Sequence, residues 1–170
     1  YQPLRVHIPC SVVYLAPVES AELIRVLIEK VPGADGVIFA THCHNDLGMA
    51  TANSLAAVAG GARQIECTIN GLGERAGNTA LEEVVMAMKV RGDIMPYYTD
   101  IDTTKLMNIS HRVATVSGFA VQFNKAIVCK NAFAHESGTH QDGMQKNTCL
   151  LYTTDVAANP SRVEIAGPRS

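Results

Sequence analysis

The sequence has little net charge, no closely spaced cysteine pair and no long apolar run. Its 14 Lys and Arg against 16 Asp and Glu give a net charge of −2, without the basic surplus typical of nucleic-acid-binding proteins. The five cysteines show no Cys-x-x-Cys spacing, which suits reduced, mostly buried thiols in a cytoplasmic setting. No apolar run is long enough to span a bilayer, and the first residues lack the layout of a signal peptide. The composition, with 47% hydrophobic residues, predicts a soluble globular protein without nucleic-acid or membrane partners.

Two histidines, His42 and His44, follow a short apolar segment at residues 36–40. The β-branched and aromatic residues of this segment predict a strand. Side chains two positions apart on an extended chain point to the same face, so the two imidazoles are expected to lie together. Such a pair is suited to bind a metal ion. The alternative is one hydrogen-bonded core histidine and one loop histidine, because His-x-His is a short and common pattern.

Expected strands and helices alternate along the first half of the chain. Strands are expected at residues 5–8, 37–41 and 64–69, and helices at residues 20–31, 49–58, 79–89 and 103–116. This alternation is typical of a parallel sheet with helices. We expect the three strands to be adjacent in chain order, with the helices on one side, because right-handed crossovers return beside the strand they left. Polar residues at the ends of neighbouring strands then lie close together.

A glycine-rich segment at residues 70–77 ends at Asn78, which has two interpretations. Asn78 stands before an expected helix, so its side chain is suited to cap that helix, and spacing alone favours this role. The other interpretation places its amide beside the two histidines. Thr79 and Glu82 have the spacing of a capping box. Within the loop, Glu74 and Arg75 are expected to pair and to order the backbone.

Several ordered motifs resemble one enzyme family. Residues 42–48 read His-Cys-His-Asn-Asp-Leu-Gly, residues 52–58 Ala-Asn-Ser-Leu-Ala-Ala-Val, residues 71–84 Gly-Leu-Gly-Glu-Arg-Ala-Gly-Asn-Thr-Ala-Leu-Glu-Glu-Val, and residues 131–143 Asn-Ala-Phe-Ala-His-Glu-Ser-Gly-Thr-His-Gln-Asp-Gly. With residues 124–128, they resemble the 2-isopropylmalate synthases over about residues 8–147. That family belongs to a wider class of metal-dependent TIM-barrel enzymes with homocitrate synthase, citramalate synthase and hydroxymethylglutaryl-CoA lyase. The form of residues 136–143 favours isopropylmalate synthase over these relatives.

The resemblance implies an α/β fold and a set of site residues. Residues 1–126 would form the last three βα units of a partial (β/α)8 TIM barrel, and residues 127–170 the start of an α-rich, irregular linker subdomain. The family's divalent metal cation, taken as Mn, Zn or Mg, would be bound by His42, His44 and Asn78, and His42 would also bind substrate. His140 would act in catalysis at the partner subunit's active site in a homodimer of the full-length enzyme.

The implied reaction condenses acetyl-CoA with 2-oxoisovalerate to 2-isopropylmalate, in leucine biosynthesis, with the metal polarising the 2-oxo carbonyl. The loop after the first strand departs from the family form Ile-Pro-Asp-Thr-Val-Gly-Tyr, since Cys10 replaces the Asp and Val13 the Gly. Ser11 keeps a hydroxyl where the family has a substrate-contacting Thr, so Ser11 is the substrate-binding candidate there. The alternatives are citramalate or homocitrate synthase, or a non-catalytic remnant of a barrel.

The sequence contains 170 residues, whereas a complete (β/α)8 barrel needs about 200 or more. By the resemblance, its strands are the sixth, seventh and eighth of the barrel, and the first strand, which supplies a metal-binding Asp in the family, is absent. We expect the chain alone to be inactive, with weak metal binding. The side chains expected to face the barrel interior are Val6, Ile8, Ile38 and Ala40.

Overall fold

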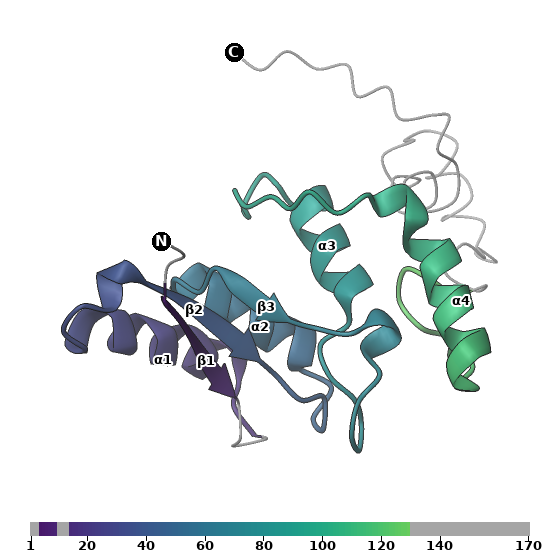
Figure 1. Ribbon diagram of the computed structural model, residues 1–170, viewed down its shortest axis with the longest axis horizontal. Helices are drawn as coiled ribbons and strands as arrows, with labels where there is room; N and C mark the ends of the chain where they lie inside the picture. Colours follow the sequence, from purple (N-terminus) through teal and green to yellow (C-terminus); the bar gives the residue numbers. More distant parts are fainter. Residues whose placement is uncertain (1–3, 10–13, 130–170) are drawn as a thin grey trace, which may run out of the picture. The chain divides into compact units, whose positions relative to one another are not determined.

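A three-stranded parallel sheet forms the centre of the first part of the chain. The structure is a computed structural model that describes residues 4–9 and 14–129. The chain divides into two compact units, Tyr1–Val84 and Val85–Ser170. In the first, strands β1 (Leu4–Pro9), β2 (Val37–His42) and β3 (Gln64–Glu66) pair in the order β1-β2-β3 (Figure 1). Both pairings are parallel, so the predicted strand order and direction are confirmed.

Strand β3 is shorter than predicted because the chain turns away from the sheet at Thr68. The Thr68 amide donates to the Thr79 carbonyl at 2.9 Å instead of pairing with β2. A 3₁₀ turn at Ile69–Gly71 follows immediately, where Asn70 has a φ of 61°. Residues 67–69, expected to continue the strand, therefore begin the glycine-rich loop.

The strand register decides which side chains share a face of the sheet. His7 pairs with Ala40, and His42 pairs with Glu66. Because Ala40 and His42 are two positions apart on β2, all four side chains lie on one face of the sheet. Val6 pairs with Phe39, which is buried in the core under the helices. The expectation that Val6 and Ile8 face the barrel interior is therefore wrong.

The corrected assignment follows from the side-chain period of two. Ile8 packs against the same core cluster as Phe39, whereas Ile38 and Ala40 lie on the opposite face of β2. The face opposite the helices thus carries Ile38 and Ala40, as predicted, without Val6 and Ile8.

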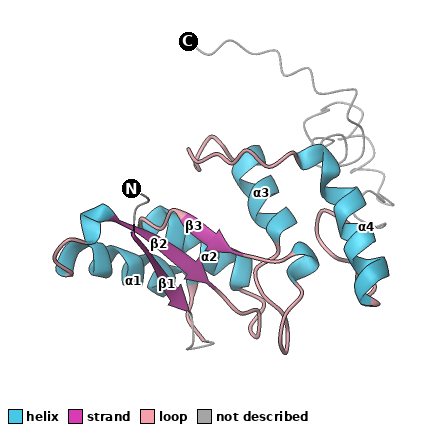
Figure 2. Ribbon diagram, in the orientation of Figure 1, coloured by secondary structure: helices cyan, strands magenta, loops and turns pink. Residues whose placement is uncertain are grey.

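Two helices cover one face of this sheet, as Figure 2 shows. They are α1 (Pro17–Lys30) and α2 (Ala50–Gly60). The core between helices and sheet consists of Ile24, Ala34, Phe39, Ala57 and Ala62, with Ile8, Leu27, Ile28 and Val37 packed around it. Helix α1 starts three residues earlier than predicted, because Pro17 suits the first helical position. The predicted layering, with both crossover helices on one side, is confirmed for this unit.

Two further helices follow the glycine-rich loop. Helix α3 (Leu81–Val90) lies across the boundary of the two units in sequence, and α4 (Leu106–Ser117) belongs to the second. Asp102 accepts from the Thr104 amide at 3.1 Å and opens the 3₁₀ turn Thr103–Lys105 that leads into α4. None of the described helices is long and apolar enough to cross a membrane. The predicted linker subdomain, residues 127–170, lies almost entirely outside the described residues and stays a prediction.

Candidate metal centre

The two predicted ligand histidines lie side by side at the end of β2. His42 is the last residue of β2, and its ring centroid is 4.9 Å from that of His44, with the ring planes at 72°. This arrangement agrees with the spacing of two residues on an extended chain. Cys43, between them, is buried on the other side, where it packs with Ala50 and Leu15. The alternation therefore presents two imidazoles together and directs the thiol into the core.

Asn78 is brought to His44 by pairing of the two loops that carry them. His44 and Asn78 form an isolated antiparallel bridge. On either side, the Asn45 amide donates to the Gly77 carbonyl at 2.8 Å and the Thr79 amide to the Cys43 carbonyl at 3.2 Å. Helix α3 begins only at Leu81, so the interpretation of Asn78 as its cap is wrong. The backbone thus places Asn78 beside the histidines, as the second interpretation requires.

Two buried polar atoms at this bridge lack hydrogen bonds. Among the described residues, neither His44 Nδ1 nor Asn78 Oδ1 has a partner. The amide nitrogen of Asn78 makes a long contact of 3.5 Å with the Leu72 carbonyl, which directs Oδ1 away from Leu72. A buried polar group without a partner costs about 1–3 kcal/mol, so a ligand that binds these atoms would recover that cost. Imidazole nitrogen and amide oxygen are both donors to divalent cations, so the residues fit such an ion.

The donor set in the described residues consists of two imidazoles and one amide. No group of three or more His, Cys, Asp or Glu side chains is placed to hold a metal ion within residues 4–9 and 14–129. His42, His44 and Asn78 alone leave a divalent charge without a carboxylate to neutralise it.

Two glycines shape the loop around Asn78. A Cβ at Gly73 would lie 2.6 Å from Asn78 Cγ and 2.8 Å from its Oδ1, so only glycine leaves room for this side chain. Gly77 has a φ of 97°, and a Cβ there would lie 2.2 Å from the Gly71 carbonyl oxygen. Gly73 therefore makes room for the Asn78 side chain, and Gly77 allows close approach of the backbone to Gly71.

Glu66 connects the histidine of β2 to a histidine of β1. Its Oε2 lies 3.0 Å from His42 Nδ1, and its Oε1 contacts His7 Nδ1. Sequence reasoning did not select either Glu66 or His7. The strand register would have revealed Glu66, because this charged residue ends β3 directly beside His42.

An ion pair between Asp46 and Arg75 joins the loop after His44 to the loop before Asn78, and these two segments are called the ligand loops below. Arg75 donates to both carboxylate oxygens of Asp46, at 2.8 and 3.1 Å, and makes a longer contact of 3.4 Å with Glu74. The expected Glu74–Arg75 pair thus exists but is secondary to the bidentate pair. Hydrogen bonds from the Arg75 guanidinium hold the pKa of the Asp46 carboxyl below its ordinary value of 3.8. This pair keeps the segment after His44 next to the segment before Asn78.

Thr79 anchors the glycine-rich loop that carries Asn78 to α2. It does not form the predicted capping box with Glu82. Its hydroxyl lies 2.7 Å from Ser54 Oγ and donates to the Ala50 carbonyl at 3.2 Å. Thr79 and Ser54 are both fully buried. Glu82, the other half of the expected box, accepts from the Asn70 amide at 3.1 Å and so holds the loop from the opposite end.

Two predicted site residues lie outside the described part of the chain. Ser11, with its neighbours Cys10 and Val13, falls in residues 10–13, and His140 falls in residues 130–170. Their roles in substrate binding and catalysis therefore stay predictions.

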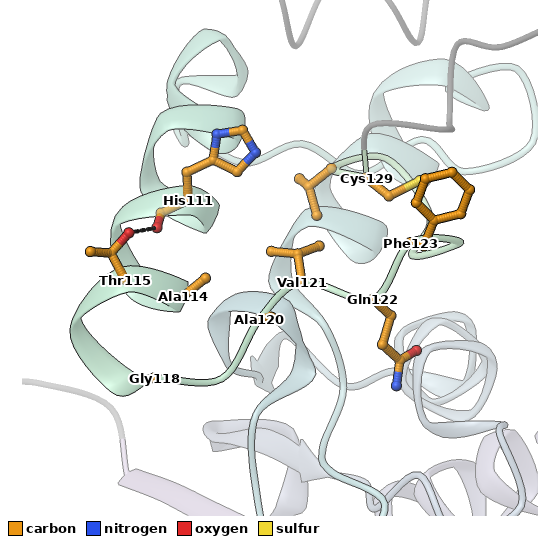
Figure 3. Close-up of a pocket in the computed structure, with 10 residues that line it drawn as sticks. His111, Ala114, Thr115, Gly118, Ala120, Val121, Gln122, Phe123 and Cys129 are labelled. Atoms are coloured by element: carbon orange, nitrogen blue, oxygen red, sulfur yellow. Dashed lines mark hydrogen bonds between the residues drawn. The ribbon is translucent and has the colours of Figure 1, made fainter.

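The second unit contains a separate cavity of about 520 Å³ (Figure 3). Its lining is mainly apolar and comprises His111, Ala114, Thr115, Gly118, Ala120, Val121, Gln122, Phe123, Val128 and Cys129. The Thr115 hydroxyl donates to the His111 carbonyl at 2.9 Å, as the dashed line in Figure 3 shows. Of the predicted site residues that the structure describes, His42, His44 and Asn78, none lines this cavity.

Comparison with known proteins identifies the family. Residues 1–113 match the model of the family described as HMGL-like. The chain is 66% identical over 142 residues to the 2-isopropylmalate synthase of Caulobacter sp. (strain K31) and 61% identical to that of Methylobacterium nodulans, covering 84% of this chain each time. It spans 27% of the length of either relative, about a quarter.

Solved structures agree on the fold. A hydroxymethylglutaryl-CoA lyase from Pseudomonas aeruginosa matches with a TM-score of 0.56 at 19% identity, over 84% of this chain and 43% of that one. The N-terminal domain of a putative aldolase from Bacteroides vulgatus matches with the same TM-score of 0.56 at 22% identity, over 67% of this chain and 35% of that one. The family model covers more than half of the chain, and the sequence is 61–66% identical to the two 2-isopropylmalate synthases compared. The chain therefore belongs to the HMGL-like family, with a sequence that resembles the 2-isopropylmalate synthases.

Proposed function

We propose that this chain contributes the metal-binding edge of an enzyme that condenses acetyl-CoA with 2-oxoisovalerate to 2-isopropylmalate. The observation that carries the proposal is the pair of unsatisfied buried atoms, His44 Nδ1 and Asn78 Oδ1, beside His42. The curated relatives named 2-isopropylmalate synthase support this reaction over those of citramalate and homocitrate synthases.

The ligand roles follow from the chemistry of the side chains. His42, His44 and Asn78 would hold a divalent cation, and two imidazoles favour Zn or Mn over Mg. The bound cation supplies Lewis-acid polarisation of the 2-oxo acid's carbonyl. By holding the ion, His42 and His44 would position the substrate carbonyl at this edge, while the Asp46–Arg75 pair keeps the His44 and Asn78 loops together.

The remaining assignments rest on the resemblance. The three βα units are the last three of a (β/α)8 barrel, residues 1–126, and residues 127–170 begin a linker subdomain. Ser11 contacts the substrate, and His140 acts in the partner subunit's active site of a homodimer. The described cysteines Cys43, Cys67 and Cys129 are free thiols, which supports a reducing cytoplasmic setting.

The test is a chimaera in which the 142 aligned residues of this chain replace the matching segment of the Caulobacter sp. (strain K31) relative. We expect release of the CoA thiol from acetyl-CoA that requires both 2-oxoisovalerate and a divalent metal. The isolated 170-residue chain is expected to release none, because its three described strands cannot close a barrel.

Substrate replacement separates the alternatives. Turnover of the chimaera with pyruvate alone would indicate a citramalate synthase, and with 2-oxoglutarate alone a homocitrate synthase. A folded chimaera that binds metal without turning over any 2-oxo acid would favour the non-catalytic alternative and contradict the proposal.

A further inference from the structure

Two residues next to the candidate metal centre, His7 and Glu66, have no role in the proposed function. His7, His42 and Glu66 come from the three strands of the sheet, and the strand register places them on the face opposite the helices. Glu66 contacts one imidazole with each carboxylate oxygen. Its side chain is 32% exposed and that of His42 29%, so both hydrogen-bonding ends are partly shielded from water.

The contact with Glu66 determines which nitrogen of His42 carries the proton. An ionised carboxylate can only accept hydrogen bonds, so His42 Nδ1, 3.0 Å from Glu66 Oε2, must be the protonated nitrogen. In the neutral ring the lone pair then lies on Nε2. The nitrogen left free to bind a metal is thus the one that points away from Glu66.

We propose that Glu66 is a positioning residue that holds His42 in the Nδ1–H form and fixes its ring for metal binding through Nε2. The proposal rests on the metal centre of the proposed function. Metal-binding histidines commonly donate their second ring N–H to a carboxylate, which fixes the tautomer and raises ligand basicity. Each Glu66 oxygen contacts an imidazole, so the proposal assigns Glu66 the role of a hydrogen-bond acceptor and not that of a metal ligand.

His7 completes the arrangement by holding the other oxygen of the same carboxylate. Its Nδ1 contacts Glu66 Oε1 from β1, and its side chain is 54% exposed. A glutamate side chain held by one hydrogen bond still rotates about its terminal torsion, whereas two contacts, one from β1 and one from β2, fix the carboxylate plane. The three strands therefore orient His42 jointly, although only β2 supplies the ligand.

The experiment uses the full 170-residue chain and two substitutions at Glu66, with a matched control. Glu66→Ala removes the acceptor, Glu66→Gln retains one acceptor oxygen at nearly the same volume, and Gln64→Ala changes the same face of β3 two residues earlier. Nitrogen-15 NMR of the metal-free chain at mildly alkaline pH distinguishes the protonated from the lone-pair nitrogen of His42. Zinc affinity is measured in parallel by competition with a chromophoric chelator.

We expect His42 to be Nδ1-protonated in the unsubstituted chain, in Gln64→Ala and in Glu66→Gln, and to lose this preference in Glu66→Ala. Zinc affinity should fall about 10- to 100-fold in Glu66→Ala, less in Glu66→Gln, and remain unchanged in Gln64→Ala. Circular dichroism identifies a variant that fails to fold, in which case Glu66→Gln and the unsubstituted chain still decide the tautomer.

Two results would overturn the proposal. One is an Nε2-protonated His42 in the unsubstituted chain, and the other is a Glu66→Ala variant whose tautomer and zinc affinity equal those of Gln64→Ala. Failure of the proposed metal centre gives a different result, because the unsubstituted chain would then bind no zinc. The nitrogen-15 measurement of the His42 tautomer would still show whether Glu66 fixes the Nδ1–H form.

Discussion

His44 and Asn78 pair across an antiparallel backbone bridge, and each contributes a buried polar atom without a hydrogen-bond partner among the described residues. The residues are 34 positions apart, and neither lies in a regular strand or helix. Buried polar atoms without partners cost stability unless a ligand binds them, and the proposed metal ion is such a ligand. The predictions below test that interpretation.

Replacing His44 by Ala should lower metal affinity and turnover together. The substitution removes a ligand nitrogen, so the loss of zinc affinity should exceed the about 10- to 100-fold typical of a residue that only supports a ligand. Turnover is measured in the chimaera and zinc affinity in the 170-residue chain. His111→Ala is the control, because it removes an exposed imidazole from α4. Unchanged metal stoichiometry and rate in His44→Ala would exclude the ligand role.

Replacing Gly73 by Ala should weaken metal binding without removing any ligand atom. The new Cβ would lie 2.6 Å from Asn78 Cγ, so the amide has to move. Gly36→Ala is the matched control, since no atom lies within 4 Å of a Cβ at Gly36. Zinc titration of both variants checks the prediction, and equal affinities would show that the Asn78 position does not matter.

Replacing Arg75 by Gln should lower zinc affinity by loosening the two ligand loops. Arg75 bridges 29 residues to Asp46, so its loss frees the segment after His44 from the segment before Asn78. Arg91→Gln removes a similar bidentate pair, to Asp93, that joins residues only two apart. Affinity should fall only in Arg75→Gln. An equal response of the two variants would point to a general effect of charge.

The Asp46–Arg75 pair should also make stability depend on acid pH. The pKa of Asp46 is lowered in the folded state by Arg75, below the ordinary value of 3.8. A lowered folded pKa contributes stability that is present above pH 3.8 and is lost as the pH falls through the folded value. Asp46→Asn should therefore be less stable than the unsubstituted chain at neutral pH, and the difference should shrink towards pH 3 in urea unfolding. A difference that stays constant with pH would contradict this assignment.

Replacing Thr79 by Val should destabilise the first unit by about 1–3 kcal/mol. Valine keeps the shape of threonine but leaves the Ser54 hydroxyl, fully buried at 0% exposure, without its partner 2.7 Å away. Thr115→Val, on the exposed side of α4, should be nearly neutral. Urea unfolding of both variants measures the difference, and equal stabilities would mean that the Ser54–Thr79 contact contributes nothing.

Local patterns in the sequence predicted that His42 and His44 lie together, but not which side chains contact them. The His42-x-His44 spacing predicted a shared face, because alternation along a strand depends only on neighbouring residues. Glu66 was missed because its partnership with His42 depends on the register between two strands, which the alternation of a single strand does not contain. The same ambiguity of one residue caused the wrong assignment of Val6 and Ile8 to the barrel interior.

Arg75 and Asn78 show a second limit of local reasoning. Glu74 is the nearest acid to Arg75 in sequence, but Asp46 accepts the bidentate pair because the loops meet in space. The helix-cap interpretation of Asn78 failed for a related reason. Its backbone is held by the bridge to His44, and α3 starts three residues later than Asn78. Tertiary contacts overrode local preference at both positions.

The pairing of the ligand loops also makes the site visible to amide hydrogen exchange. The amides of Asn45 and Thr79 donate from one loop to the other, so each can exchange with deuterated water only when the loops separate. An ion held by His44 and Asn78 binds the joined state and reduces the population of the open one. The protection of these two backbone amides thus becomes a thermodynamic record of site occupancy, readable without a chromophore or a turnover assay.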